Sequence, residues 1–170
     1  MTVAELNTLP IAEARLAFER CCGCTGWVDQ MVTRRPFADQ AQLLAFARDA
    51  WDALPPEDWR DAFAHHPRIG DRASLEGRSA ASADLAAREQ AGATSASRAT
   101  LEALAEGNRA YQERFGYIFI VFASGRSADE MLAILRNRLG NQPEAELALA
   151  AAEQWKIMRL RLERLLDETS

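Results

Sequence analysis

The stretch "PEAELALAAAEQWKIMRLRLERLL", residues 143–166, predicts the longest helix of the chain and thereby its fold class. Pro143 suits the first position of a helix, where its missing amide hydrogen would have no partner in any case. Apolar side chains then recur at helical spacing along the whole stretch, which gives the helix one face to bury. That face consists of Leu147, Ala150, Ala151, Trp155, Met158, Leu162 and Leu165.

Helical spacing of apolar residues also dominates the rest of the chain. The predicted helices cover residues 10–21, 27–32, 36–54, 55–65, 83–91, 97–114 and 127–140. In the first of them, Ile11, Ala14, Leu16 and Phe18 are expected near one face. Residues 70–85 are small and polar, which indicates a surface loop.

One apolar run, "FGYIFIVFASG" at residues 115–125, has no helical period. Because no second convincing strand exists to pair with it, we interpret it as a buried extended segment that leads into a helix. Ser127 and Glu130 then have the spacing of a capping box. The sequence therefore predicts a single all-α domain, residues 1–170, of roughly seven to nine helices.

Composition restricts the classes of partner. The chain has 170 residues, of which 48% are apolar and 26% charged, with a net charge of −5 and a pI near 5.1. The absence of a basic stripe makes nucleic acid an unsuitable partner. No apolar stretch approaches the ~20 residues of a membrane span, and the first residues lack the pattern of a signal peptide. We therefore expect a cytoplasmic protein without membrane contact.

All three cysteines lie in "CCGC", residues 21–24. Their odd number fits a reducing compartment. Cys21 and Cys24 form a C-x-x-C pair, which either acts as a redox dithiol or packs as small apolar side chains. A redox pair needs a nearby base or cation, and this segment contains no histidine.

The two histidines of the chain, His65 and His66, are adjacent in "FAHHPRIGDR" at residues 63–72. Pro67 disfavours helical geometry at His66, so the preceding helix must end there. An imidazole exchanges a proton near neutral pH, which makes His66 either a catalytic group or an ordinary corner residue. His65 is still on the helix and is the weaker candidate for a catalytic role.

Two further polar positions are candidates. Glu89 and Gln90, in "AAREQAG" at residues 86–92, border either a pocket or a solvated helix face. Arg161 lies between Leu160 and Leu162 on the last helix. A partly buried arginine usually binds an anion, which here is either a ligand or an internal carboxylate.

Four motifs in this order, "HPRIGD", "REQAG", "ERFGYIFIVFASGRS" and "KIMRLRLERL", together resemble the 2-oxo-4-hydroxy-4-carboxy-5-ureidoimidazoline (OHCU) decarboxylase family. The resemblance covers essentially the whole chain, including "CCGCTGWVDQM" at residues 21–31. It implies an all-helical homodimer that needs no cofactor and no metal. Such an enzyme releases CO2 from OHCU, its small-molecule substrate, and delivers (S)-allantoin in urate degradation.

The resemblance also implies roles for individual residues. His66 would be the catalytic histidine, with Glu89 and Arg161 as the other catalytic groups, Gln90 beside the glutamate and Pro67 lining the pocket. The family often has serine where this chain has Ala86, so one hydroxyl contact is missing or is replaced by Ser82. The backbone that would bind the ring of the substrate belongs to Tyr117, Ile118, Phe119, Ile120 and Val121.

Two other functions remain open from the residues alone. A C-x-x-C thiol redox enzyme would lose activity when Cys21 and Cys24 are replaced. A non-catalytic helical binding module would show no turnover at all.

Overall fold

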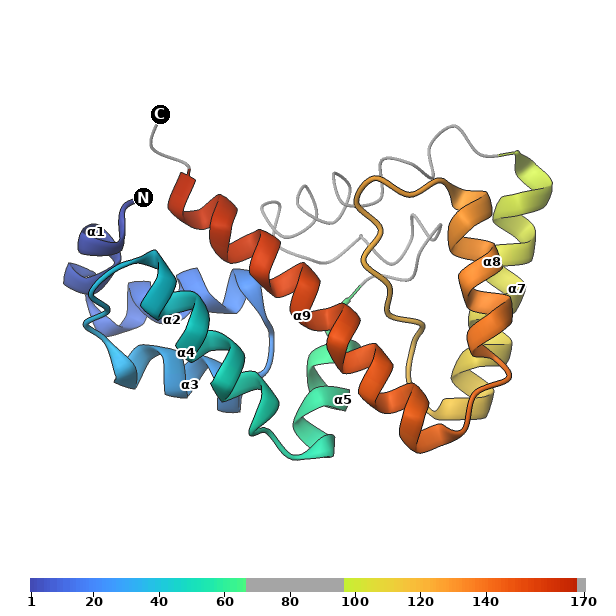
Figure 1. Ribbon diagram of the computed structural model, residues 1–170, viewed down its shortest axis with the longest axis horizontal. Coiled ribbons are helices and arrows are strands. Elements are labelled where there is room, and N and C mark those ends of the chain that lie inside the picture. Colours follow the sequence, from blue (N-terminus) through green and yellow to red (C-terminus); the bar gives the residue numbers. More distant parts are fainter. Residues whose placement is uncertain (67–96, 168–170) are drawn as a thin grey trace. The chain divides into compact units, whose positions relative to one another are not determined.

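The computed structural model describes residues 1–66 and 97–167 of the chain (Figure 1). Within these ranges it contains eight α-helices and no β-strand, so the all-α prediction is confirmed. The helix predicted at residues 83–91 and the loop predicted at 70–85 lie outside the described residues. None of the helices in the described ranges combines the length and apolar character that a bilayer crossing requires.

The chain divides into two compact units. Unit 1 comprises Met1–His65 together with Trp155–Ser170, and unit 2 comprises His66–Gln154. The division falls within the long helix α9, Pro143–Asp167, whose first part belongs to unit 2 and whose second part belongs to unit 1. That the chain is a single domain stays a prediction.

Unit 1 contains the first five helices of the chain. Helix α3 packs against both α2 and α4, and the core between them is rich in tryptophan. Trp27 is fully buried, donates from its indole nitrogen to the carbonyl of Ala47 at 3.0 Å and meets the ring of Phe18 edge-on. The helices are α1 Val3–Thr8, α2 Ile11–Cys21, α3 Thr25–Arg34, α4 Gln40–Asp52 and α5 Pro56–Ala64.

Two details of unit 1 differ from the prediction. Ile11 and Leu16 are 69% and 56% exposed, whereas the buried face of α2 is the set Ala14, Ala17, Phe18 and Cys21. Ile11 is the first residue of the helix. A residue two positions from Ala14 and from Phe18 points away from that face. Helix α4 starts at Gln40, not near residue 36, because the Asp39 side chain caps it by accepting from the Gln42 amide.

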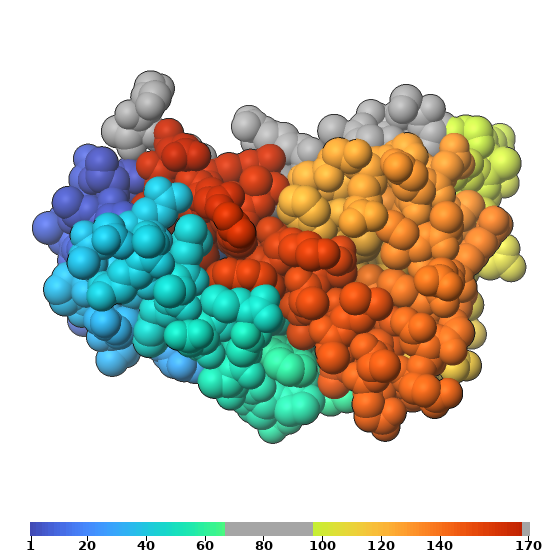
Figure 2. Space-filling view, viewed as in Figure 1, coloured from blue at the N-terminus to red at the C-terminus, as the bar shows by residue number. Residues whose placement is uncertain are grey.

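Unit 2 is built on α7, Arg98–Phe115, and α8, Ala128–Arg138, which lie side by side in Figure 1. Gly107 permits their close approach, since a Cβ atom there would lie 2.6 Å from a methyl group of Leu135. Gly116 ends α7 with a φ of 81°, a conformation that glycine adopts without strain. Figure 2 shows α8 at the surface of this unit, in orange.

The apolar run after Gly116 is neither helix nor strand, and most of it is buried, as predicted. The capping box at Ser127 and Glu130 is also confirmed. The serine hydroxyl accepts from the Glu130 amide, and the glutamate carboxylate accepts from the Ser127 amide at 2.7 Å. These contacts fix the point at which the extended segment becomes α8.

Candidate functional site

His66 lies where the sequence predicts it, immediately beyond the end of α5. The helix ends at Ala64, and His65 closes it by donating its amide to the carbonyl of Ala62 at 3.2 Å. His66 is half-buried, whereas the side chain of His65 is 55% exposed and approaches Asp61 at 3.9 Å. The half-buried histidine is therefore the one that precedes Pro67.

The "CCGC" segment contacts this histidine corner. A Cβ atom on Gly23 would lie 2.4 Å from Cγ of His65 and 2.7 Å from its Cβ, so the imidazole packs directly on the glycine backbone. No other residue type leaves room for this contact. Gly23 thus lets the end of α2 meet the end of α5.

Arg161 reaches the same segment from α9. Its Nη1 donates to the carbonyl of Cys21 at 3.5 Å, and its side chain is half-buried. Arg159, two residues earlier, is exposed and pairs with Glu163 at 2.8 Å. Within unit 1, Arg161 and His65 therefore both contact residues 21–23. The partial burial of Arg161 agrees with its predicted place among leucines.

The cysteines themselves are buried, and all three are free. Burial raises the pKa of the Cys22 thiol strongly and outweighs the opposite effect of nearby Arg161. Burial also raises the pKa of Cys24. Of the predicted C-x-x-C pair, Cys24 thus has a raised pKa, which disfavours the thiolate that a redox dithiol needs.

The predicted substrate-binding segment lies in unit 2, between α7 and α8. Tyr117, Phe119, Ile120 and Val121 are buried, and Ile118 is half-buried. Because most of these side chains fill the core, the segment has mainly its backbone amides and carbonyls to offer a ligand.

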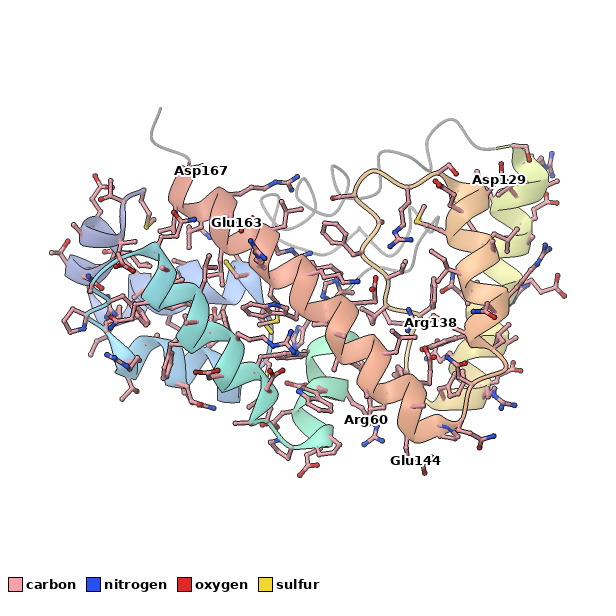
Figure 3. The ribbon with its side chains drawn as sticks, viewed as in Figure 1. Arg60, Asp129, Arg138, Glu144, Glu163 and Asp167 are labelled. Atoms are coloured by element: carbon pink, nitrogen blue, oxygen red, sulfur yellow. The ribbon has the colours of Figure 1, made fainter. Side chains whose placement is uncertain are left out.

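A buried ion pair next to this segment escaped the sequence analysis. Arg138 is 3% exposed and pairs with Glu146, which is fully buried. Figure 3 labels Arg138 at the end of α8, and its Nη1 donates to the carbonyl of Ile120 at 2.7 Å. The available signal was its spacing, because Arg138 continues the apolar stripe of Met131 and Leu135.

Four predicted site residues lie outside the described residues: Pro67, Ala86, Glu89 and Gln90. The same holds for Ser82. The structure thus describes the surroundings of Arg161, of the histidine corner and of residues 117–121, each within its own unit.

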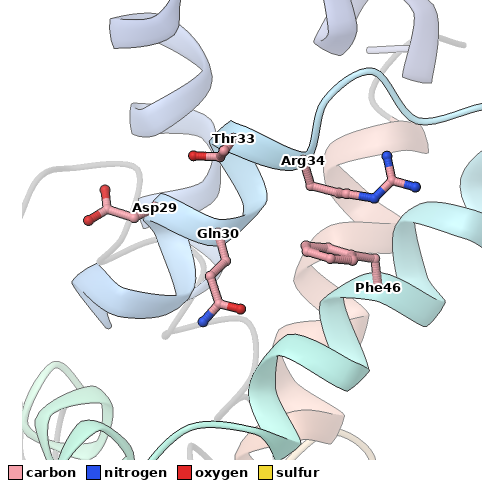
Figure 4. A pocket seen from close by; sticks show the side chains of 5 residues that line it. All are labelled: Asp29, Gln30, Thr33, Arg34 and Phe46. Carbon is pink, nitrogen blue, oxygen red and sulfur yellow. The ribbon is translucent and has the colours of Figure 1, made fainter.

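The rest of the described ranges shows neither a metal-binding cluster nor a pocket formed by the predicted site residues. No group of three histidine, cysteine or acidic side chains is arranged there to hold a metal ion. An open pocket on α3 and α4 is lined by Asp29, Gln30, Thr33, Arg34 and Phe46 (Figure 4). None of these residues belongs to the predicted site.

Comparison with known proteins places the chain in a family. The family model for OHCU decarboxylase matches residues 7–163. The uric acid degradation bifunctional protein TTL of Arabidopsis thaliana is 38% identical over 149 residues, which are 87% of this chain but 46% of the plant protein. The 2-oxo-4-hydroxy-4-carboxy-5-ureidoimidazoline decarboxylase of Amia calva is 32% identical, over 78% of this chain and 75% of its own length.

A solved structure gives the same result. An OHCU decarboxylase crystallised in the presence of (S)-allantoin superposes with a TM-score of 0.74 at 36% identity, covering 88% of this chain and 96% of that one. This chain spans about half the length of the Arabidopsis protein and nearly all of the crystallised one. With its helical fold, its histidine corner and its match over residues 7–163, the chain belongs to the OHCU decarboxylase family.

Proposed function

We propose that this protein decarboxylates OHCU to (S)-allantoin and CO2 in urate degradation. The relative from Amia calva carries the name of this activity, and the match of the family model covers most of the chain. The geometric observation that carries the proposal lies within unit 1, where Arg161 and His65, the residue before His66, both contact residues 21–23. These contacts place the guanidinium of Arg161 and the turn that begins at His65 against one short segment.

The chemistry needs little from the protein. The C–C bond to the carboxylate breaks, and its electron pair passes into the adjacent C=N bond of the substrate. One proton then completes allantoin, so the reaction is OHCU carboxylate plus a proton giving allantoin plus CO2. Because the ring accepts the electrons, we propose that the enzyme works without a cofactor. The protein has to orient the substrate, stabilise charge and direct protonation to one face.

The residues divide these tasks among them. His66 acts at the hydroxyl and carboxylate end of the substrate and promotes loss of CO2. Glu89 orients His66 and favours its protonated form, since a nearby negative charge stabilises the imidazolium. Arg161 binds a carboxylate or ureido carbonyl through two parallel hydrogen bonds.

The remaining contacts hold the ring. Gln90 and Pro67 line the pocket, and the backbone of residues 117–121 bonds the amide groups of the substrate. Ala86 supplies no hydroxyl, so this contact is absent or comes from Ser82. The burial of Phe119, Ile120 and Val121 supports recognition by backbone.

The decisive test is a coupled assay. OHCU is generated from urate by the two upstream enzymes, and circular dichroism follows the formation of (S)-allantoin. We expect a rate above spontaneous decay and an optically pure product, both of which disappear in His66→Ala. Arg159→Gln is the control for Arg161→Gln, because Arg159 is exposed and pairs with Glu163 on its own helix. A racemic product at the spontaneous rate would reject the proposal.

We also propose that the protein is a cytoplasmic homodimer. The dimeric state follows from the resemblance to a dimeric family, and the three free cysteines fit a reducing compartment. Sedimentation equilibrium measures the oligomeric state. A monomer at assay concentration would contradict it.

A further inference from the structure

Charged side chains hold one stretch of the segment between α7 and α8. The carbonyl of Ile120 accepts from Nη1 of Arg138 at 2.7 Å. The amide of Phe122 donates to Oε2 of Glu153 at 2.8 Å, and its carbonyl accepts from Nε of Arg126 at 3.0 Å. All of these residues belong to unit 2.

These side chains bond backbone groups that a neighbouring strand would bond in a β-sheet. Buried amides and carbonyls need partners, which an extended segment usually finds in a sheet. The described residues contain no strand, so side chains from α8, α9 and the α8 entry supply the partners instead. The bonded groups belong to Ile120 and Phe122, two positions apart.

The bond to the Ile120 carbonyl comes from Arg138, which forms a buried ion pair with Glu146. Nε of Arg138 donates to Oε1 of Glu146 at 2.7 Å, and the same oxygen accepts from the hydroxyl of Tyr111. Oε2 accepts from the side-chain amide of Asn141 at 2.7 Å. Burial raises the pKa of Tyr111, so its hydroxyl stays a donor. Both carboxylate oxygens of Glu146 are thus bonded, and this carboxylate holds the guanidinium of Arg138.

The guanidinium of Arg138 also fixes the residue before Ile120. Its central carbon lies 4.8 Å from the centroid of the Phe119 ring, a cation–π contact. One side chain thus sets both the direction of the Ile120 carbonyl and the rotamer of Phe119.

Alternation along the backbone gives these contacts a consequence. In an extended chain, the amide and carbonyl of one residue point to one side, and those of the next residue point to the other. For an extended segment this alternation assigns the bonded groups of Ile120 and Phe122 to one side and the backbone groups of Phe119 and Val121 to the opposite side. That side is where a planar ligand with amide groups can bond.

We infer that Arg138, held by Glu146, and Glu153 are positioning residues that lock one edge of residues 119–122, so that the backbone groups of Phe119 and Val121 form the edge that binds substrate. This inference rests on the proposed function, because it assigns a part of the same site. It separates the residues of the predicted segment into two groups. The Ile120 carbonyl already accepts from Arg138, whereas Phe119 and Val121 are assigned to the substrate.

The kinetic test uses Arg138→Lys, with exposed Arg136→Lys on the same helix as its matched control. Lysine keeps the charge but has no planar fork to bond Glu146 and Ile120 together. We expect kcat/KM for OHCU to fall at least tenfold, mainly through a higher KM, because misplacing substrate contacts by about 1 Å costs up to about 100-fold. The assay runs well below the unfolding temperature, so reduced stability alone leaves kcat and KM unchanged.

A second test measures whether Glu153 protects the Phe122 amide from hydrogen exchange. Hydrogen exchange by NMR follows the Phe122 amide in Glu153→Ala and Glu153→Gln. Alanine removes the acceptor and glutamine keeps one, so exchange should accelerate only in the alanine variant. The exposed Glu144→Gln on α9, labelled in Figure 3, is the control for changing a glutamate in this helix.

The outcomes separate the two proposals. If the wild-type protein does not turn over OHCU, the proposed function fails, whereas exchange still reports whether the edge is held. If Arg138→Lys keeps wild-type kcat and KM, or if Phe122 exchanges equally in both Glu153 variants, the positioning inference is wrong. Loss of kcat/KM in Arg138→Lys together with selective exchange in Glu153→Ala supports it.

Discussion

The imidazole of His65 lies on the backbone of Gly23, and this single contact connects the histidine corner to "CCGC". The carbon atoms closest to the missing Cβ are Cγ and Cβ of His65, which are near its own backbone. Such atoms cannot swing aside like the end of a long side chain. The position of His66, the next residue, therefore depends on a glycine on another helix end.

Gly23→Ala should accordingly displace the corner. We expect unfolding in urea to show a loss of about 1–3 kcal/mol from overpacking, together with a lower kcat for OHCU. Gly140→Ala is the control, because its Cβ would meet only the Asn137 carbonyl at an ordinary 3.5 Å. Equal stability and activity of Gly23→Ala and wild type would refute this packing.

The buried thiol of Cys22 makes stability sensitive to alkali. In the unfolded chain the thiol ionises near its ordinary pKa of 9.0, whereas burial raises that pKa in the folded protein. The unfolded state thus releases a proton that the folded state retains, so this stabilisation is complete below pH 9 and is lost as the pH rises further. The loss is about 1.4 kcal/mol per pH unit for one such group.

We predict that the free energy of unfolding falls above pH 9 and falls less steeply in Cys22→Ala. Chemical denaturation at a series of pH values measures both slopes. Identical slopes for the two proteins would show that the thiol ionises equally in both states.

At the residue scale, sequence patterns predicted a site residue when its neighbours made it unusual. Arg161 between two leucines was expected to be partly buried, and it is. Arg138 and Glu146 were missed because charged residues are read as exposed by default. Their burial is compensated by partners on other segments, such as Ile120 and Tyr111, which spacing along one helix does not reveal. The pairing partner of a buried charge depends on tertiary structure.

At the scale of elements, a helix start was predictable where two residues gave the spacing of a reciprocal cap. The capping box of α8 was recognised from Ser127 and Glu130 alone. The buried face of α2 was wrong at Ile11 and Leu16, because apolar character does not guarantee burial when small residues form the contact face. The start of α4 was placed too early because Phe37 is buried without being helical.

The cap predicts a defined effect on α8. Ser127→Ala removes the hydroxyl that accepts from the Glu130 amide and should cost about 1 kcal/mol. Ser127→Asp keeps an acceptor and should lose much less. Thermal unfolding by circular dichroism compares them, and kcat should stay at the wild-type value because Arg138 lies at the other end of the helix. Equal melting temperatures of Ser127→Ala and wild type would contradict a stabilising cap.

For the whole molecule, the order of segments along the chain limits independent folding. Unit 1 needs Trp155–Ser170, which follow all of unit 2 in the sequence, and α9 is continuous across the division. The sequence predicted α9 well, because its apolar stripe is long and regular. It gave no sign of two units, since the division does not coincide with a loop.

We predict that the chain unfolds in one cooperative transition. Calorimetry should give a calorimetric enthalpy equal to the van't Hoff enthalpy, because the shared helix must melt when either unit melts. Two resolved heat-absorption peaks would show that the units unfold separately.

The discontinuity of unit 1 also matters while the chain is being made. The first five helices leave the ribosome long before the part of α9 that carries Ile157, Met158, Leu162 and Leu165, all buried in the finished protein. Until that part is translated, the nascent helices lack one side of their core and expose apolar surface, which is the condition that recruits chaperones. Unit 1 can therefore complete its core only at the end of synthesis, and rare codons within residues 66–154 would lengthen the vulnerable interval.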